Sequence, residues 1–159
     1  MFSIIACIGK NGELGLNGDL VFHIREDMKF FKEMTTGHAV LMGAKTFESL
    51  PGALIGRKNY VVTHHPEKLP EGVEAVKDLK SFIKEHLNSD EEIFVIGGAG
   101  IYSELLAFSK TLYLTEVNRD ARADVYFPQF DKTMYNKSII KEGYQDDLAY
   151  SFVKYTRKY

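Results

Sequence analysis

The sequence contains no tryptophan, four prolines and a single cysteine among its 159 residues. One cysteine cannot form an internal disulfide, and Cys7 lies in the apolar run 2–8, which is typical of a buried strand and not of a metal or redox motif. We therefore expect a reducing, cytoplasmic compartment. No window reaches the roughly 20 apolar residues that a membrane-spanning helix needs, and the chain does not begin with a basic and apolar leader. We expect a soluble protein without a targeting segment.

An excess of charge of one sign is also missing. The 20 basic and 22 acidic residues are interspersed and leave a net charge of −2. This balance offers no electrostatic reason to bind nucleic acid or an anionic membrane, so we expect a small molecule as the main partner. We also expect a monomer. The chain has no Gly-x-Ser-x-Gly elbow, and His64 and His65 have no further ligand at metal-binding spacing. Neither covalent hydrolysis nor a metal site is predicted.

Short β-rich runs alternate with helical patterns. The expected strands cover residues 2–8, 39–42, 59–63, 92–96 and 111–117, and the expected helices cover 25–35, a short stretch from 45, 79–87 after Asp78, and 101–107. This alternation favours an α/β fold with a central, mostly parallel twisted sheet and helices on both faces. Segments 138–142 and 150–157, joined by a polar connection, predict a C-terminal antiparallel hairpin at the sheet edge. Without repeats or linkers, residues 1–159 are expected to form one domain.

The longest expected irregular stretch, residues 9–23, is called the lid loop below. It contains Gly9, Gly12, Gly15 and Gly18. A loop of this length within a compact domain is usually functional.

Asp27 lies on the apolar face of the first expected helix, which also carries Ile24, Met28, Phe31 and Thr35. One interpretation is an acid in the first helical turn, favoured by the helix dipole. The other is a carboxylate in an apolar pocket, where desolvation raises its pKa and it can bind a protonated or amidine-like ring. The residues alone leave both interpretations open.

Two strand ends carry glycine directly before a helix, in segments 96–102 (Ile-Gly-Gly-Ala-Gly-Ile-Tyr) and 42–46 (Met-Gly-Ala-Lys-Thr). Backbone N–H groups at a helix start bind anions, and two such sites on neighbouring strands suggest a dinucleotide. The spacing is not the Gly-x-Gly-x-x-Gly fingerprint, and ordinary strand-to-helix turns remain an alternative. Arg57, at the mouth of a strand, could pair with a ligand carboxylate or be a solvated surface group.

Taken in order, these segments resemble bacterial dihydrofolate reductase over essentially the whole chain. The matching positions are Ile5-Ala6, Leu14-Gly15, Asp27 with Phe31, Met42-Gly43 with Thr46, Ser49, Leu54, residues 56–59, residues 96–98, Ile101-Tyr102, residues 112–115, and Asp124 with Phe127-Pro128. The resemblance implies NADPH-dependent reduction of 7,8-dihydrofolate to 5,6,7,8-tetrahydrofolate, by hydride transfer to pterin C6 and protonation at N5.

The resemblance also implies a substrate site. Asp27 would hydrogen-bond the pterin N3 and 2-amino groups with help from Thr115, and Phe22 would complete the catalytic set. Arg57 would pair with the α-carboxylate of the glutamate tail. The other implied substrate contacts are Ile5, Ala6, Met28, Phe31, Ser49, Leu50, Leu54, Ile96 and Tyr102.

A cofactor site for NADPH is implied in the same way. The nicotinamide ribose would be covered by Ala6, Cys7, Leu14, Gly15 and Leu20. The pyrophosphate would lie on Gly43, Ala44, Lys45, Thr46, Gly97, Gly98, Ala99, Gly100 and Ile101, and Ile96 and Tyr102 would orient the nicotinamide. The adenosine end would meet Thr63, His64, His65 and Lys77. In that family the peptide between the glycines that match Gly97 and Gly98 is cis.

The sequence departs from the family pattern at two places. Val21-Phe22 replaces the usual Pro-Trp, and phenylalanine donates no hydrogen bond; we hypothesise that Phe22→Trp raises the rate of hydride transfer or protonation. Ala44 and Gly100 stand where arginines often clamp the 2′-phosphate of NADPH. We hypothesise that discrimination between NADPH and NADH is reduced.

Two alternative functions are considered. A related riboflavin-pathway pyrimidine reductase would share the glycine segments, but Asp27 and Arg57 argue against it. A non-catalytic folate- or nucleotide-binding protein is the second alternative, and Phe22 and Ala44 give it some support. NADPH absorbance with and without dihydrofolate distinguishes these functions.

Overall fold

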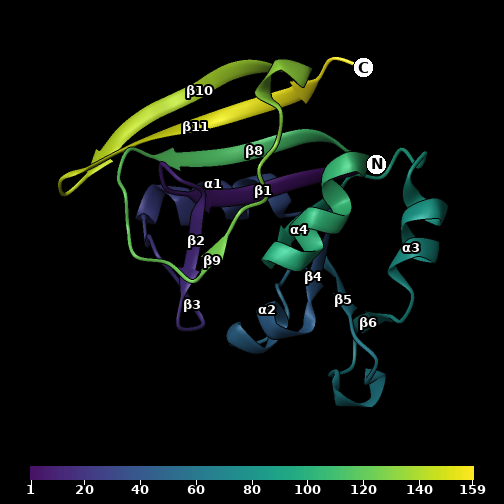
Figure 1. The fold of residues 1–159 in the computed structure, drawn as a ribbon. Coiled ribbons are helices and arrows are strands. Elements are labelled where there is room, and N and C mark those ends of the chain that lie inside the picture. The colour runs from purple at the N-terminus through teal and green to yellow at the C-terminus, as the bar shows by residue number, and fades with distance from the viewer.

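One eight-stranded sheet organises the computed structural model, which describes residues 1–159 (Figure 1). The strand order is β10-β11-β8-β1-β7-β4-β5-β6. Neighbours from β8 to β6 pair in parallel, whereas β11 and β10 add an antiparallel hairpin at one edge. The strands are β1 (Phe2–Ile8), β4 (Ala39–Gly43), β5 (Lys58–Val62), β6 (Val73–Val76), β7 (Ile93–Gly97), β8 (Ser109–Val117), β10 (Tyr135–Gln145) and β11 (Leu148–Arg157). The predicted fold class is confirmed.

Helices cover both faces of this sheet, with α4 in front of it and α1 behind it in Figure 1. The helices are α1 (Arg25–Thr35), α2 (Ala44–Ser49), α3 (Leu79–His86) and α4 (Ala99–Leu105), with short 3₁₀ turns at Pro66–Lys68, Leu106–Phe108 and Lys132–Met134. The Asp78 side chain caps α3 by accepting a hydrogen bond from the Ser81 N–H. No helix is both long and apolar enough to cross a membrane.

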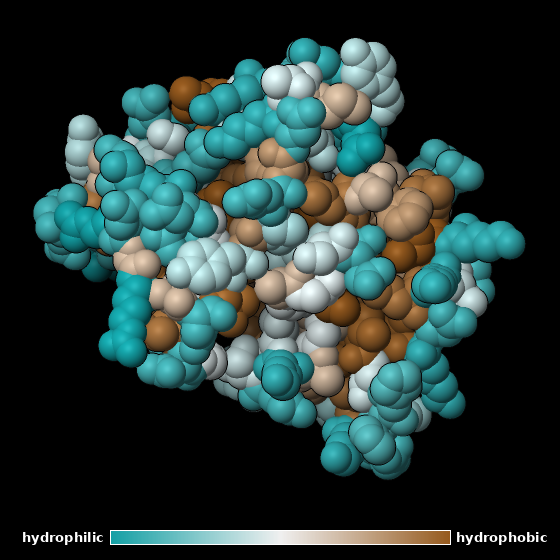
Figure 2. Space-filling view, in the orientation of Figure 1, coloured by the Kyte–Doolittle hydropathy of each residue, from teal (hydrophilic) through white to brown (hydrophobic).

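Alternating side chains of β1 divide the core between the two faces of the sheet. Ile4 and Ala6 belong to the main cluster, which includes Tyr102 of α4. Ile5 belongs to a second cluster, against which side chains of α1 and α2 pack. Each fully buried aliphatic or aromatic side chain contributes about 1.5–3 kcal/mol. Polar and charged residues cover most of the face shown in Figure 2, with apolar patches between them.

The lid loop is less irregular than expected. It contains β2 (Glu13–Leu16) and β3 (Asp19–Leu20), which form a separate three-stranded sheet with β9 (Val125–Tyr126). The sequence also missed β6. These strands have only two to four residues, too few for a recognisable period, and β9 pairs with a segment far away in the chain.

The hairpin is longer than expected, because β10 and β11 extend until only Asp146 and Asp147 remain between them. Asp146 adopts a positive φ of 56°, which suits such a tight turn. Helix α4 begins at Ala99, two residues before its predicted start, and ends at Leu105. The predicted bounds of β1 and α1 are confirmed, and the remaining bounds differ from the prediction by at most two residues.

The predicted apolar face of α1 is confirmed at Ile24 and Thr35, which are fully buried, and at Phe31, which packs against the second cluster. It is wrong at Met28, which is 61% exposed, while Phe30 and Met34 pack against the core instead. Phe30 stacks on Phe152 of β11, with ring centroids 4.6 Å apart. Spacing within the helix therefore predicted most of the buried face, and contacts with the sheet decided that Phe30 and not Met28 completes it.

Candidate active site

The Asp27 carboxylate lies between α1 and the carboxyl ends of β1 and β8. Thr115 donates a hydrogen bond of 2.5 Å to Asp27 Oδ1. Cys7 is the cross-strand partner of Thr115, and its thiol lies near the carboxylate. Burial raises the pKa of Asp27, and the polar groups of Thr115 and Cys7 only partly offset this, so the pKa stays above its ordinary value. Asp27 is therefore a desolvated carboxylate.

Groups around Asp27 have little contact with water. Burial, and then the charge of Asp27, raise the pKa of the Cys7 thiol well above its ordinary range. Tyr102 is buried on α4, and its hydroxyl donates a 2.8 Å hydrogen bond to the Ile5 carbonyl. Phe22 is 7% exposed and belongs to a cluster of Ile24, Val117, Tyr150 and Phe152, against which Cys7 packs. The charge of Asp27 thus meets few competing solvent dipoles.

Half-buried apolar side chains continue from this carboxylate across one face of the sheet. They pack against the second cluster and come from α1, the end of α2, the following loop and β7: Phe31, Leu50, Leu54 and Ile96. Three further predicted contacts do not belong to this apolar wall. Met28 is exposed, and the Ser49 hydroxyl is exposed and bonds the Thr46 carbonyl at 2.6 Å. Ala6 belongs to the main cluster on the other face, because side chains alternate along β1.

Arg57 has no acidic partner in the chain. Its guanidinium donates to the Ile55 carbonyl at 3.0 Å and to the Thr35 hydroxyl at 3.1 Å, and burial lowers its pKa. The sequence reasoning gave no role to Asn59, which is buried and bonds the N–H and carbonyl of Leu54 and the carbonyl of Arg57. Asn59 therefore holds the loop that presents Arg57. Its place two residues after that arginine was the only available signal.

The two glycine segments meet at the carboxyl ends of β4 and β7, where Met42 pairs with Gly97. A Cβ at Gly43 would lie 3.3 Å from Ile101 Cγ1, and one at Gly97 would lie 3.3 Å from Thr46 Oγ1. The Gly97–Gly98 peptide is cis, as the resemblance implied.

The helices that follow, α2 and α4, have Gly43 and Gly98 as their N-cap residues and therefore lack a side-chain cap. Their first N–H groups are therefore not bonded to a capping side chain, and a Cβ at Gly100 would meet open space. These adjacent donors, with Lys45 and Thr46 beside them, fit the diphosphate of a dinucleotide.

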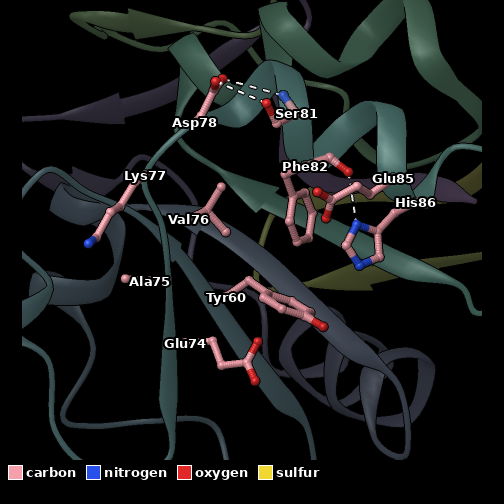
Figure 3. A pocket seen from close by; sticks show the side chains of 10 residues that line it. All are labelled: Tyr60, Glu74, Ala75, Val76, Lys77, Asp78, Ser81, Phe82, Glu85 and His86. Atoms are coloured by element: carbon pink, nitrogen blue, oxygen red, sulfur yellow. Dashed lines mark hydrogen bonds between the residues drawn. The ribbon is translucent and has the colours of Figure 1, made fainter.

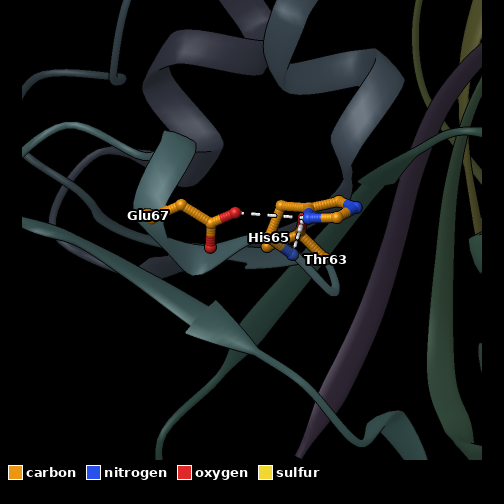
Figure 4. A network of polar contacts seen from close by, with 3 residues as sticks. All are labelled: Thr63, His65 and Glu67. Carbon is orange, nitrogen blue, oxygen red and sulfur yellow. Dashed lines mark hydrogen bonds and ion pairs between the residues drawn. The ribbon is translucent and has the colours of Figure 1, made fainter.

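The residues expected at the adenosine end lie at the carboxyl ends of β5 and β6, where the Thr63 N–H donates to the carbonyl of Val76, the residue before Lys77, at 3.1 Å. Thr63 and His65 line a cavity of about 320 Å³ with Ala44 and Lys68, whereas Lys77 lines a groove of about 460 Å³ beside α3 (Figure 3). The His65 N–H bonds the Thr63 hydroxyl at 3.0 Å, and its ring Nδ1 lies 3.2 Å from the Glu67 carboxylate (Figure 4). His64 is exposed.

Three charged residues that the sequence prediction did not include lie at or beside the cavity that Thr63 and His65 line. Glu67 brings a negative charge to the place where a phosphate was expected. Lys68 adds a positive charge to the same cavity. The third residue, Glu48, also lines this cavity. No motif marked them, because they lie on a 3₁₀ turn and on a helix face whose contacts depend on the fold.

The predicted contacts from the lid loop have different environments. Leu14 is buried in the main cluster, and Leu20 is 51% exposed. Gly15 pairs with Leu20 and Val125, and its carbonyl accepts a hydrogen bond from the Asp124 N–H at 2.9 Å. The side chain of Leu14 therefore serves packing, while Gly15 and Leu20 lie nearer the surface.

Comparisons with known proteins give a consistent result. The sequence model of the family described as Dihydrofolate reductase matches residues 1–157. The chain is 35% identical to Dihydrofolate reductase of Bacillus subtilis over 161 residues, covering 99% of this chain and 95% of the relative. It is 34% identical to Dihydrofolate reductase of Neisseria gonorrhoeae over 159 residues, covering 98% of each.

A solved structure is similar over the same extent. Dihydrofolate reductase from Enterococcus faecalis, complexed with NADP(H) and RAB-propyl, superposes with a TM-score of 0.89 at 26% identity. The match covers 100% of this chain and 97% of that protein.

Proposed function

The chain belongs to the dihydrofolate reductase family, and from this premise we propose that Asp27 and Thr115 bind and polarise the pterin ring of its substrate. The protein is an oxidoreductase that reduces dihydrofolate with NADPH. NADPH, when bound, supplies the hydride. The observation that carries the assignment of residues is the desolvated Asp27 carboxylate, held by Thr115 at 2.5 Å.

Asp27 has one oxygen engaged and one available. Thr115 donates to Oδ1, so Oδ2 can accept hydrogen bonds from the pterin N3 and 2-amino groups. A carboxylate with few water contacts interacts strongly with a cation, because the local dielectric is low. Its negative charge would therefore stabilise the pterin with a proton on N5.

The remaining substrate residues would orient the ligand and exclude water. Phe31, Leu50, Leu54 and Ile96 offer an apolar wall for the rings. Arg57, which has no acidic partner in the chain, would form a bidentate pair with the glutamate α-carboxylate. Orientation and exclusion of water are the main contributions expected from such groups.

For the cofactor, the uncapped N–H groups around Gly43 and Gly98 support a pyrophosphate site, with Lys45 and Thr46 beside it. The lid loop, from Leu14 to Leu20, would cover the nicotinamide ribose together with Cys7. Thr63, His64, His65 and Lys77 would meet the adenosine end, and Lys68 lines the same cavity as Thr63 and His65. Lid movement would then limit access of water and ligands.

The two alternative functions are not favoured. A riboflavin-pathway pyrimidine reductase would not need the unpaired Arg57, and a binding protein without catalysis would not need a desolvated Asp27. The family match over residues 1–157 supports the reductase.

We also propose that residues 1–159 form one domain that works as a cytoplasmic monomer. The main cluster runs from Phe2 to Tyr155, which supports a single core. Sedimentation of the purified protein tests the monomer, and fractionation of cells tests the cytoplasmic location.

The proposed residues are tested by following NADPH absorbance with and without dihydrofolate. We expect the wild type to consume one NADPH per dihydrofolate. Asp27→Asn should lose most of this activity, whereas Glu26→Gln, a neighbouring exposed acid, should retain it. Equal activity of Asp27→Asn and the wild type would refute the role of Asp27, and NADPH consumption by none of the proteins would refute the enzyme.

A further inference from the structure

Glu13 is the only charged residue among the buried side chains, with 1% of its surface exposed. It lies at the start of β2, within the lid loop. Glu13 Oε1 accepts a hydrogen bond from the Asn11 N–H at 2.6 Å, and Oε2 accepts one from the Ala121 N–H at 2.7 Å. No lysine, arginine or histidine forms an ion pair with it. Backbone donors therefore satisfy this carboxylate.

The two hydrogen bonds join segments that are far apart in the chain. Asn11 belongs to the beginning of the lid loop, and Ala121 belongs to residues 118–124, which connect β8 to β9. The Lys10 N–H also donates to the Arg119 carbonyl, at 3.1 Å. A Cβ at Gly9 would lie 2.7 Å from Glu13 Oε1 and 2.9 Å from the Arg119 carbonyl oxygen. The loop start, the carboxylate and residues 119–121 are therefore packed without space for another atom.

Other polar contacts between these segments are exposed. Asn11 Nδ2 donates to Asp120, and the Asn17 N–H donates to Asp124, both at the surface where water competes. Glu13 differs because water cannot replace its partners. Burial would raise the pKa of Glu13, but N–H groups of Glu13, Ala121 and Asn11 hold it below its ordinary value. The carboxylate is therefore charged at neutral pH and bonded through both oxygens.

A buried charge without a counterion is an unusual way to stabilise a fold, because an apolar side chain of similar size would pack there without desolvation. A carboxylate specifies one arrangement of its donors, since both N–H groups must point at it. Leu14, the next residue, is buried in the core, and Gly15 pairs with Leu20 and Val125. Because Leu14 and Gly15 follow Glu13 directly in the chain, the position of Glu13 constrains the positions of residues 14–20.

We propose that Glu13 is a positioning residue for the reduction: its carboxylate anchors the start of the lid loop to residues 119–121 and so sets where residues 14–20 lie over the cofactor. This inference rests on the proposed function, in which the lid loop covers the nicotinamide ribose. Glu13 touches neither substrate nor cofactor and acts through the lid loop.

The test compares Glu13→Gln and Glu13→Ala with Glu92→Gln. Glutamine keeps the shape of Glu13 but can accept at only one of the two oxygen positions. Glu92 makes a matched control, because it accepts a 2.6 Å hydrogen bond from Ser3 at the opposite end of β1. Losing one such bond should raise the NADPH dissociation rate of Glu13→Gln roughly 3- to 10-fold. Folate binding without cofactor should change by less than about twofold, because the folate contacts are remote.

Amide hydrogen exchange provides a readout that does not depend on ligands. Glu13→Gln should speed exchange of residues 10–21 and leave β7 unchanged, and Glu13→Ala should do so more strongly. Glu92→Gln should alter neither the lid loop nor NADPH dissociation. Unchanged exchange in both Glu13 variants would overturn the anchor. Faster exchange with an unchanged NADPH dissociation rate would overturn its role in the reaction. If the wild type neither binds NADPH nor reduces dihydrofolate, the proposed function fails, and exchange still decides whether Glu13 anchors the loop.

Discussion

The hydroxyl of Thr115 donates a 2.5 Å hydrogen bond to the Asp27 carboxylate, although 88 residues separate them in the chain. Thr115 is held opposite Cys7 by the parallel pairing of β8 with β1. The site thus joins a helix start to two neighbouring strands. Its charge, hydrogen bonds and exposure to water can each be changed by a single substitution.

Asp27 should make the ligand-free protein less stable as pH rises. The pKa of Asp27 is raised above 3.8 in the folded protein. Between pH 3.8 and the folded-state pKa, the folded protein therefore binds more protons than the unfolded chain. Stability contributed by the protonated acid is present below 3.8 and is lost as pH rises through the folded pKa. Asp27→Asn should therefore have a higher Tm than the wild type at pH 7, with a smaller difference at acidic pH. An Asp27→Asn protein that is less stable at pH 7 would contradict this.

Thr115→Val should shift the pH dependence of the reaction. The Thr115 hydrogen bond lowers the pKa of Asp27, so its loss raises that pKa further and moves the acid limb of kcat/KM to higher pH. A hydrogen bond to a charged group is worth about 1.5–3 kcal/mol, so kcat/KM at neutral pH should fall roughly tenfold or more. Thr115→Ser keeps the hydroxyl and should resemble the wild type. An acid limb that does not move in Thr115→Val would argue against the polarising role.

Arg57→Gln should weaken binding of the substrate tail without affecting the ring. Loss of a charged pair predicts a rise in KM for dihydrofolate of roughly 10- to 100-fold. A dihydropterin without the glutamate tail provides the control, because its kcat/KM should be unchanged. Arg57→Lys should recover only part of the loss, since lysine cannot form the bidentate pair. If both substrates lose activity equally, Arg57 acts on the loop and not on the tail.

Discrimination between NADPH and NADH should be weak. Ala44 and Gly100 supply no charge, and His65 lies 3.2 Å from Glu67, whose carboxylate repels a phosphate. Ala44→Arg should raise the ratio of kcat/KM for NADPH over NADH roughly tenfold, and Ala44→Gln should not. Glu67→Gln should move the ratio in the same direction. A strong preference of the wild type for NADPH, independent of pH, would show that other residues recognise the 2′-phosphate.

Phe22→Trp tests the departure from the family pattern. We expect a faster pH-dependent hydride-transfer or protonation step in stopped-flow experiments, because the indole N–H can donate a hydrogen bond. Phe22 is buried among Val117, Tyr150 and Phe152, so the larger ring should also lower stability by about 1–3 kcal/mol. Phe22→Tyr adds a hydrogen-bond donor with little extra volume, so it distinguishes the effect of the donor from the effect of the larger ring. A rate that is unchanged or lower in Phe22→Trp would count against the hypothesis.

Local sequence patterns were sufficient to predict a strand or helix where that element is long and apolar or carries its own capping residue. The run that forms β1 and the Asp78 cap of α3 could both be read directly, because each depends on neighbours within a few residues. Asp27 could be named as a candidate for the same reason. Its desolvation could not, because the residues that cover it come from other elements.

Contacts between distant segments were beyond the sequence pattern. The burial of Glu13 depends on Ala121, which lies 108 residues away in the chain. No residue near Glu13 in the sequence predicts this hydrogen-bond partner. The prediction that Met28 lies on the buried face of α1 was wrong for the same reason, since it depends on which side of the helix meets the core.

By itself, the sequence determined the succession of strands and helices, the glycines at two strand ends and the acid on the first helix. These features arise from the conformational preferences and apolar period of adjacent residues. Only the tertiary structure decided that Asp27 loses water while Thr115 bonds it, that Arg57 stays without an acid, and that Glu13 joins two loops. Strand pairing brings these groups together although they are far apart in the chain. The residues next to each group do not indicate which distant segment it will contact.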